Sequence, residues 1–193
     1  NNKYNSLGND TRYFVITGGR GSGKSFAITT FLAFLTFEQG HKILFTRYTM
    51  ISAANSIIPE FLEKLELYGI IEHFRITKDE ILNISTGSSI LFKGIRTSAG
   101  NQTAALKSIS GITTWVLDEA EELIKEEDFD KIDQSVRSKS KPNRVMMILN
   151  PTTKEHWIYQ RFFAGKGVNP GTNDFVDNVT YVHTTFKDNI ENL

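Results

Sequence analysis

The sequence predicts an α/β fold with a central, mainly parallel β-sheet flanked by helices. Short β-rich runs alternate with helical patterns along all 193 residues, which is the order that parallel sheets require. Residues 113–117 (TTWVL) and Arg144–Leu149 (RVMMIL) are short, mainly apolar runs, as expected of central parallel strands. A glycine-rich stretch lies directly between the first strand and the first helix.

The first three elements are a strand, a helix and a strand. Residues 12–17 (RYFVIT) are rich in β-branched and aromatic side chains, which favours a strand. Residues 24–38 form a helical pattern that is apolar on nearly all sides, as for a helix packed against a sheet. Residues 42–46 (KILFT) are the second strand.

The next segment combines an amphipathic helix with a hairpin. Residues 52–68 place apolar side chains at helical spacing. Residues 80–84 and 89–93 flank the turn Thr86-Gly87-Ser88, which predicts a β-hairpin.

The second half continues the alternation. The two apolar runs, 113–117 and Arg144–Leu149, suit central parallel strands, and the acid-rich residues 126–138 between them predict the crossover helix. Residues 154–163 predict a further helix and residues 178–186 a late strand. We expect one domain over residues 1–193.

Composition excludes several classes of protein. The chain carries 22 Lys plus Arg and 22 Asp plus Glu, so it is not a histone-like polycation. It has no cysteine, which excludes disulfide scaffolds, thiol catalysis and cysteine-ligated zinc. No apolar run approaches the roughly 18–20 residues of a membrane span. The chain starts with Asn1 rather than Met, and we expect it to be a fragment of a longer protein.

Zero net charge hides an uneven distribution. Residues 118–133 contain nine acids and two lysines, a local charge of −7, which leaves +7 for the rest of the chain. A basic remainder of this size suits salt-sensitive contact with a phosphate backbone.

One motif is strong. The stretch Gly18-Gly19-Arg20-Gly21-Ser22-Gly23-Lys24-Ser25, followed by Phe26, fits the phosphate-binding pattern G-x-x-x-x-G-K-[ST]. Its glycines let successive N–H groups face a phosphate, and the next helix points its positive end there. Lys24 is expected to bind the β- and γ-phosphates, and Ser25 to ligate Mg²⁺. The motif predicts binding of ATP with Mg²⁺ by residues 18–26.

Two carboxylates follow an apolar strand. Asp118 is the expected second Mg²⁺ ligand, and Glu119 is the expected base that accepts a proton from the attacking water. The alternative is that Glu119 only begins the acidic segment. Glu121 and Glu122 are expected to be solvated.

Other nucleotide-binding classes fit less well. The nearest string to the guanine motif Asn-Lys-x-Asp is Thr77-Lys78-Asp79-Glu80, which ends in Glu, and Ser108-Ile109-Ser110-Gly111 only distantly resembles the transporter signature. The Asp-Glu pair at a strand end indicates an ATPase of the ASCE type.

Asn150, at the tip of the next apolar strand, is the candidate sensor that distinguishes ATP from ADP, although an Asn-Pro turn predicts the same local structure.

In this order the motifs resemble a phage terminase large subunit, closest to the group typified by the defective prophage PBSX. The series consists of GGRGSGKS (18–25), Phe45-Thr46-Arg47, Phe92-Lys93-Gly94, Leu106-Lys107-Ser108-Ile109, Asp118-Glu119-Ala120-Glu121-Glu122-Leu123, Asn150-Pro151 and His183-Thr184-Thr185-Phe186-Lys187-Asp188-Asn189. Family members commonly have Glu-Glu where this chain has Asp118-Glu119, which keeps both roles.

The resemblance implies an ATPase motor that drives double-stranded DNA into a procapsid in the host cell cytoplasm, with no membrane partner. It implies a ring of identical subunits that works with a portal protein and a small terminase subunit. Full-length members continue into a C-terminal nuclease domain, which we expect this chain to lack, so we expect no DNA cleavage from it.

Basic residues are candidates for neutralising the charge that develops on the γ-phosphate. Arg20 is the candidate within the loop, and Lys107 resembles the position of a basic residue that acts on a neighbouring subunit. Arg137 and Arg96 are further candidates, and each of these residues has the alternative of a solvated surface charge. Arg47, at a strand end, is expected either to contact the nucleotide or to brace the site.

The sequence leaves two questions open, which residues contact adenine and which class of function the chain has. Tyr4, Arg12 and Tyr13 lie just upstream of or within the first strand and are candidates for stacking on adenine, with Tyr13 equally suited to the core. The function is open between a DNA-translocating ATPase, a helicase-like ATPase and a module in which ATP only gates a partner interaction. A general base at Glu119 favours the hydrolytic classes.

Overall fold

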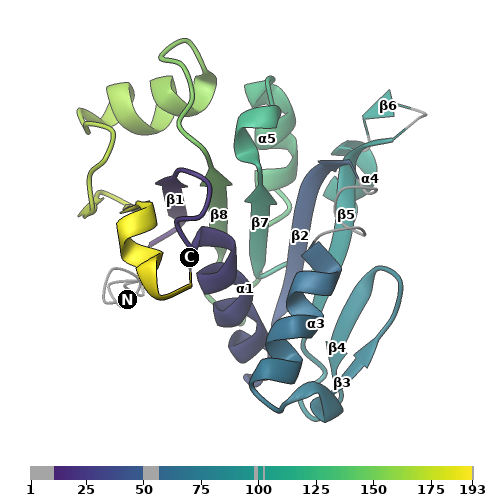
Figure 1. Ribbon diagram of the computed structural model, residues 1–193. Helices are drawn as coiled ribbons and strands as arrows, with labels where there is room; N and C mark the ends of the chain where they lie inside the picture. Colours follow the sequence, from purple (N-terminus) through teal and green to yellow (C-terminus); the bar gives the residue numbers. More distant parts are fainter. Residues whose placement is uncertain (1–10, 50–56, 98–99, 102, 193) are drawn as a thin grey trace.

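One mixed sheet organises the chain. The computed structural model describes residues 11–49, 57–97, 100–101 and 103–192, and in these residues ten strands form a single sheet (Figure 1). Its order is β3-β4-β5-β2-β7-β8-β1-β10-β9, with β6 paired to β5.

The six central strands are parallel, and the short strands at both edges are antiparallel. The parallel strands are β1 (Tyr13–Gly18), β2 (Lys42–Thr49), β5 (Ser89–Thr97), β7 (Thr114–Asp118), β8 (Arg144–Leu149) and β10 (Val179–Thr184). The antiparallel strands are β3 (Phe74–Ile76), β4 (Glu80–Asn83), β6 (Gly100–Asn101) and β9 (Asp174–Val176).

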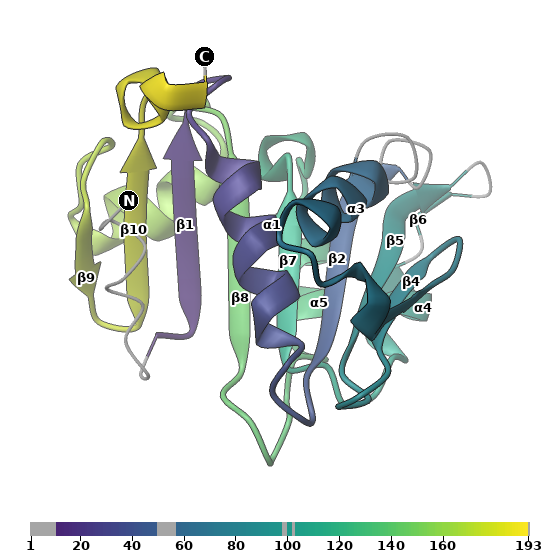
Figure 2. The ribbon, with the colours of Figure 1, turned by 60° about the horizontal axis from the view of Figure 1, so that its bottom comes forward.

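Helices cover both faces of this sheet, as Figure 2 shows, with α1 and α3 in front and α5 behind. The helical elements are α1 (Lys24–Leu35), α3 (Ile58–Leu67), η3 (Ile71–His73), α4 (Thr103–Lys107), η4 (Ala120–Glu122), α5 (Glu126–Asp133), η5 (Tyr159–Phe163), η6 (Ala164–Lys166) and η7 (Phe186–Asn192). None of those described is long and apolar enough to cross a membrane.

Side chains alternate between two cores along each central strand. Phe14 and Ile16 of β1 pack under α1 and α3, whereas Val15 packs on the opposite face. On that opposite face Trp115 of β7 meets Phe129 of α5, with ring centroids 5.0 Å apart. Burial on both faces explains why the central strands read as continuous apolar runs.

The predicted strands and the hairpin are confirmed, with differences of at most four residues at their ends, the largest where β5 continues to Thr97 rather than ending at residue 93. The hairpin closes as expected, because Gly87 adopts φ 72° and Asn83 accepts hydrogen bonds from the N–H groups of Ser85 and Thr86. The short strands β3, β6 and β9 were not predicted. Of the predicted helix 52–68, residues 58–67 are helical and 52–56 lie outside the described residues.

Three predicted helices are shorter than expected. The first ends at Leu35 rather than residue 38, where the Thr36 hydroxyl bonds the carbonyl of Ala33. The crossover helix ends at Asp133 rather than residue 138, because the Arg12 guanidinium takes the carbonyl oxygens of Asp133 and Val136. The helix predicted over 154–163 begins only at residue 157 and continues as the π-helical turn η5.

The order of the central strands determines which strand ends lie next to one another. Strand β8 lies between β1 and β7 and runs parallel to both. The carboxyl ends of β1, β7 and β8, which we call the carboxyl edge, therefore bring together Gly18, Asp118 and Leu149. The opposite ends, from Tyr13, Thr114 and Arg144, form the amino edge.

Candidate functional site

The glycine-rich loop joins β1 to α1 and leaves the helix N-terminus open. Gly21 and Gly23 adopt φ angles of 74° and 78°, which other residues adopt only with strain. A Cβ atom on Gly18 would collide with the carbonyl oxygen of Thr184. No side chain caps the first turn of α1, and that turn holds no acid, so its N–H groups and positive dipole remain available to an anion.

Lys24 is the buried cation of this loop, with 8% of its surface exposed. Its Nζ lies 2.6 Å from the carbonyl oxygen of Gly18, 2.9 Å from that of Gly19 and 3.5 Å from Asn150 Oδ1. Burial lowers the pKa of Lys24, while the carboxylates of Glu121 and Asp118 act to raise it. The ammonium group is held by neutral acceptors, for which a phosphate can substitute.

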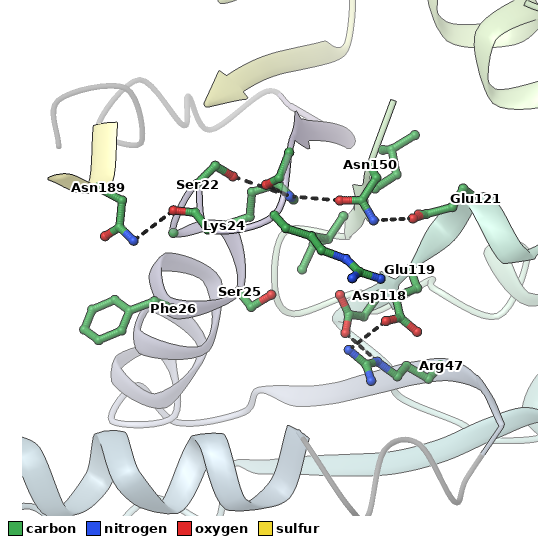
Figure 3. Close-up of a pocket in the computed structure, with 16 residues that line it drawn as sticks. Ser22, Lys24, Ser25, Phe26, Arg47, Asp118, Glu119, Glu121, Asn150 and Asn189 are labelled. Atoms are coloured by element: carbon green, nitrogen blue, oxygen red, sulfur yellow. Dashed lines mark hydrogen bonds and ion pairs between the residues drawn. The ribbon is translucent and has the colours of Figure 1, made fainter. Parts of the chain in front are cut away.

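Asp118 ends β7 and is 3% exposed. Its Oδ2 accepts a hydrogen bond of 2.7 Å from Arg47 Nε, and Arg47 Nη2 lies 3.3 Å from Glu119 Oε1 (Figure 3). Burial raises the pKa of Asp118 against the opposing effect of Arg47. Arg47 therefore contacts both carboxylates and also lines the cavity described below, so both of its expected roles stay predictions.

Glu119 has a left-handed backbone, with φ 52° and ψ 48°. This conformation costs a non-glycine residue about 1–2 kcal/mol, and strain of this kind gathers at functional sites. It turns the chain from β7 into η4. Burial raises the pKa of the Glu119 carboxyl, with Arg47 acting in the opposite direction.

Asn150 follows β8 and contacts two charged groups. Its Nδ2 donates a hydrogen bond of 2.7 Å to Glu121 Oε1, and its Oδ1 faces Lys24. The prediction that Glu121 is solvated is wrong, because the turn η4 directs its side chain back toward Asn150. Glu122 is exposed, as predicted.

Asn189 was not predicted as a site residue. Its Nδ2 donates a hydrogen bond of 3.0 Å to the carbonyl oxygen of Gly21, and its side chain lies against Gly23. Thr184 bonds the Ser22 hydroxyl at 3.1 Å from the end of β10. Both residues belong to the string 183–189 that entered the family resemblance, which was the available signal, but the string alone does not reveal a contact with the loop.

These groups surround a cavity of about 360 Å³ at the carboxyl edge (Figure 3). It is lined by Gly19, Arg20, Gly21, Ser22, Gly23, Lys24, Ser25, Phe26, Arg47, Asp118, Glu119, Glu121, Ile148, Leu149, Asn150 and Asn189. Of the predicted phosphate-loop residues, Gly18 alone is not a lining residue; its carbonyl oxygen instead holds Lys24.

The donor set fits a nucleotide with Mg²⁺. The open end of α1 and the Lys24 ammonium suit a polyphosphate. The Ser25 hydroxyl and the Asp118 carboxylate are hard oxygen ligands, and Mg²⁺ takes one or two protein ligands together with phosphate oxygens and water. Among the described residues no group of three or more acidic or histidine side chains is arranged to hold a metal ion, so phosphate and water would complete the coordination.

Some predicted residues lie elsewhere. Lys107 ends α4 and Arg137 follows α5; both are exposed and neither lines the cavity. The assignment of Arg12 and Tyr13 to adenine is wrong for this arrangement, because both bind Asp133 at the amino edge. Tyr4 lies outside the described residues.

Comparison with known proteins gives a family and a fold. A family model described as phage terminase large subunit matches residues 10–190. The large terminase from a thermophilic bacteriophage, in complex with ADP, superposes with a TM-score of 0.69 at 14% identity, over 98% of this chain and 44% of that chain. The Thermus phage P74-26 large terminase ATPase domain gives 0.63 at 18% identity, over 90% and 75%.

The N-terminal domain of the DNA packaging ATPase from bacteriophage phi29 gives a TM-score of 0.67 at 15% identity, over 95% of both chains. No curated protein matches the chain. The chain spans less than half the length of the large terminase that was solved with ADP. At these identities the solved structures establish the α/β fold.

Proposed function

The chain belongs to the phage terminase large subunit family, and from this premise we propose that it is an ATP-hydrolysing motor domain that translocates double-stranded DNA into a procapsid. The names of the similar structures support the proposal, since one is an ADP complex of a large terminase and another is a DNA packaging ATPase.

One observation carries the proposal most directly. Asp118 and Glu119 at the end of β7 and Asn150 after the end of β8 line one cavity with Lys24, the first residue of α1, whose N-terminus is open. This is the arrangement that holds a nucleoside triphosphate and activates a water molecule beside it.

Nucleotide binding is the expected role of the glycine-rich loop between β1 and α1. Its N–H groups and Lys24 would hold the phosphates, and Phe26 also lines the cavity. Ser25 and Asp118 would hold Mg²⁺, which supplies charge neutralisation to the phosphate oxygens when it is bound. Arg47 contacts both carboxylates and would hold them in place.

Hydrolysis follows from Glu119. Its carboxylate accepts a proton from water while the water oxygen attacks the γ-phosphorus and the bond to the bridging oxygen breaks, giving ADP and phosphate. Arg20 lines the cavity and would stabilise the charge that develops on the transferred phosphoryl group. Lys107 and Arg137 would act only on the cavity of a neighbouring subunit.

Substitution of the base tests hydrolysis. We expect Glu119→Gln to lower ATP turnover by about 10²–10⁴-fold while nucleotide binding persists, because a general base contributes that much. The matched control is Glu122→Gln, which removes the same charge three residues away at an exposed position. If wild type and Glu119→Gln are equally inactive even as assembled rings with DNA, the hydrolysis proposal fails and a nucleotide-gated binding module fits better. If both turn over ATP at the same rate, Glu119 is not the base.

The partners belong to the same proposal. We expect double-stranded DNA, identical subunits in a ring, a portal protein, a small terminase subunit and a nuclease domain of the parent protein, all in the cytoplasm of the infected host cell. A strand-displacement assay separates translocation from a helicase activity, which would unwind the duplex. That residues 1–193 alone do not cut DNA stays a prediction, tested by incubating them with plasmid and Mg²⁺ or Mn²⁺.

A further inference from the structure

Glu121 occupies a place in the cavity that the proposed chemistry does not use. It lies on η4, three residues after Asp118, and binds the side chain of Asn150, which is 29 residues away in the sequence (Figure 3). The Nδ2–Oε1 distance of 2.7 Å is that of a strong, charge-assisted hydrogen bond.

This bond determines which way the Asn150 amide points. An ionised carboxylate only accepts hydrogen bonds, so the amide must turn its NH₂ group to Glu121. Its oxygen is then left facing Lys24, 3.5 Å from Nζ. The flipped amide would set its NH₂ group against an ammonium and its oxygen against a carboxylate, and both contacts are repulsive.

The Glu121 carboxylate is embedded rather than solvated. Its Oε2 is buried and makes no hydrogen bond with the described residues. Of the carboxylates that act to raise the pKa of Lys24, Glu121 has the larger effect and Asp118 the smaller. Glu121 is therefore both a bonding partner of Asn150 and a close charge on Lys24.

The backbone of Glu121 connects the cavity to the helical segment that begins at residue 157. Its carbonyl oxygen accepts a hydrogen bond of 3.2 Å from His156 Nε2, while His156 Nδ1 accepts from the N–H of Ile158. Two residues on, the carbonyl oxygen of Leu123 accepts from Trp157 Nε1 at 2.5 Å. The turn η4 is thus fixed to this segment at two points.

We propose that Glu121 is a positioning residue that orients the Asn150 amide toward Lys24 and transmits the position of that amide, through η4, to the segment containing His156 and Trp157. A γ-phosphate that draws Lys24 away frees Asn150 Oδ1, while Nδ2 stays on Glu121. The difference between a triphosphate and a diphosphate thereby reaches a second element. This inference rests on the proposed ATP site.

The test compares Glu121→Ala and Glu121→Gln with the control Glu122→Ala. Glutamine keeps an oxygen that accepts from Asn150, whereas alanine does not. We expect Glu121→Ala to lower kcat for ATP by about tenfold with KM changed less than threefold, as for loss of one charge-assisted hydrogen bond. Glu121→Gln should stay within about threefold of wild type, and Glu122→Ala should equal wild type.

Equilibrium binding of fluorescent ATP and ADP analogues supplies a readout that needs no hydrolysis. We expect the ratio of the two dissociation constants to move toward one in Glu121→Ala and to stay near wild type in Glu121→Gln. Adding Asn150→Ala to Glu121→Ala should cause less than a further twofold change, because the two residues act as a unit.

Three results would overturn the inference: equal losses in the alanine and glutamine variants, an equal loss in Glu122→Ala, or additive effects of Glu121→Ala and Asn150→Ala. If Glu121→Ala does not fold, the Gln variant and Asn150→Ala, each checked by thermal unfolding, carry the same comparison. If wild type does not hydrolyse ATP, the proposed function fails, and the binding ratio still tests the role of Glu121 separately.

Discussion

Two arginine–aspartate pairs lie at opposite edges of the same sheet. At the amino edge Arg12 binds Asp133 at 2.6 Å, and at the carboxyl edge Arg47 binds Asp118 at 2.7 Å. The pairs are alike in geometry, but their surroundings differ. Asp133 also accepts from the Tyr13 hydroxyl at 2.9 Å, and the Arg12 guanidinium bonds two carbonyl oxygens, so this network is closed on itself.

The carboxyl-edge pair faces a cavity instead. Around it lie a strained Glu119, a Lys24 held by neutral acceptors, and a helix N-terminus with no cap. The comparison teaches that an ion pair does not mark a functional site by itself. A site is marked where paired charges border a cavity whose remaining polar groups suit a charged ligand.

The largest expected difference concerns turnover. Asp118→Asn should lower ATP turnover about a thousandfold, because a metal ligand contributes several kcal/mol of transition-state stabilisation. The free energy of unfolding should not fall: burial raises the Asp118 pKa above 3.8, so the fold disfavours the ionised form and a neutral isostere removes that cost. Steady-state kinetics and thermal unfolding of the same sample check both statements, and a large loss of stability would contradict the second.

The matched substitution at the amino edge should act in the opposite way. Asp133→Asn weakens the bonds to Arg12 and Tyr13 and should cost about 2 kcal/mol of unfolding free energy. For a domain of this size that lowers Tm by about 4–8 °C. At a temperature where both proteins are folded, kcat and KM should equal wild type. If Asp133→Asn lost activity without losing stability, the amino-edge pair would have a functional role, and the proposed difference between the two edges would be wrong.

A smaller effect is expected where η7 meets the loop. Asn189→Ala removes the bond to the Gly21 carbonyl and should raise KM for ATP about fivefold with kcat nearly unchanged. Asn173→Ala is the control, since Asn173 accepts a hydrogen bond from the N–H of His183 in β10 and does not line the cavity. Equal KM values in the two variants would show that Asn189 does not order the loop.

The smallest expected effect is in the pH profile of kcat/KM, which reports the free enzyme. Burial raises the pKa of Glu119 above 4.5 and lowers that of Lys24 below 10.5. The acid limb should therefore lie above the range of an ordinary glutamate, and the alkaline limb below that of an ordinary lysine.

The free energy of unfolding should change in the opposite direction to kcat/KM on the acid side. The folded state binds more protons at Asp118 and Glu119 than the unfolded state does, so their contribution to stability rises as pH falls through their raised pKa values. Glu119→Gln should flatten the acid limb of the activity profile. An unchanged limb in that variant would assign it to another group.

Local patterns predicted the centre of the molecule well. The runs 113–117 and Arg144–Leu149 are apolar because both faces of the sheet are covered, and that burial is visible in the sequence. The edge strands Phe74–Ile76 and Asp174–Val176 are three residues long and too short to leave a pattern. The early end of α5 depends on Arg12, more than 120 residues away.

The site residues also divide into those that the sequence predicted and those that it did not. The loop, Asp118, Glu119 and Asn150 were predicted because each stands in a recognisable position at a strand end. Glu121 and Asn189 were not, because their roles come from contacts across 29 and 168 residues. In the sequence Glu121 is one acid among nine, and only the left-handed turn at Glu119 explains why it points inward.

The pairing of β1 with β10 also bears on how the protein is made. Tyr13 pairs with Val179, and the phosphate loop that begins at Gly18 is bounded by Thr184 and Asn189. On the ribosome the loop emerges well before these two residues, because Thr184 follows Ser22 by 162 residues and Asn189 follows Gly21 by 168. Nascent chains should therefore gain nucleotide affinity late, after the other strands of the sheet have been translated.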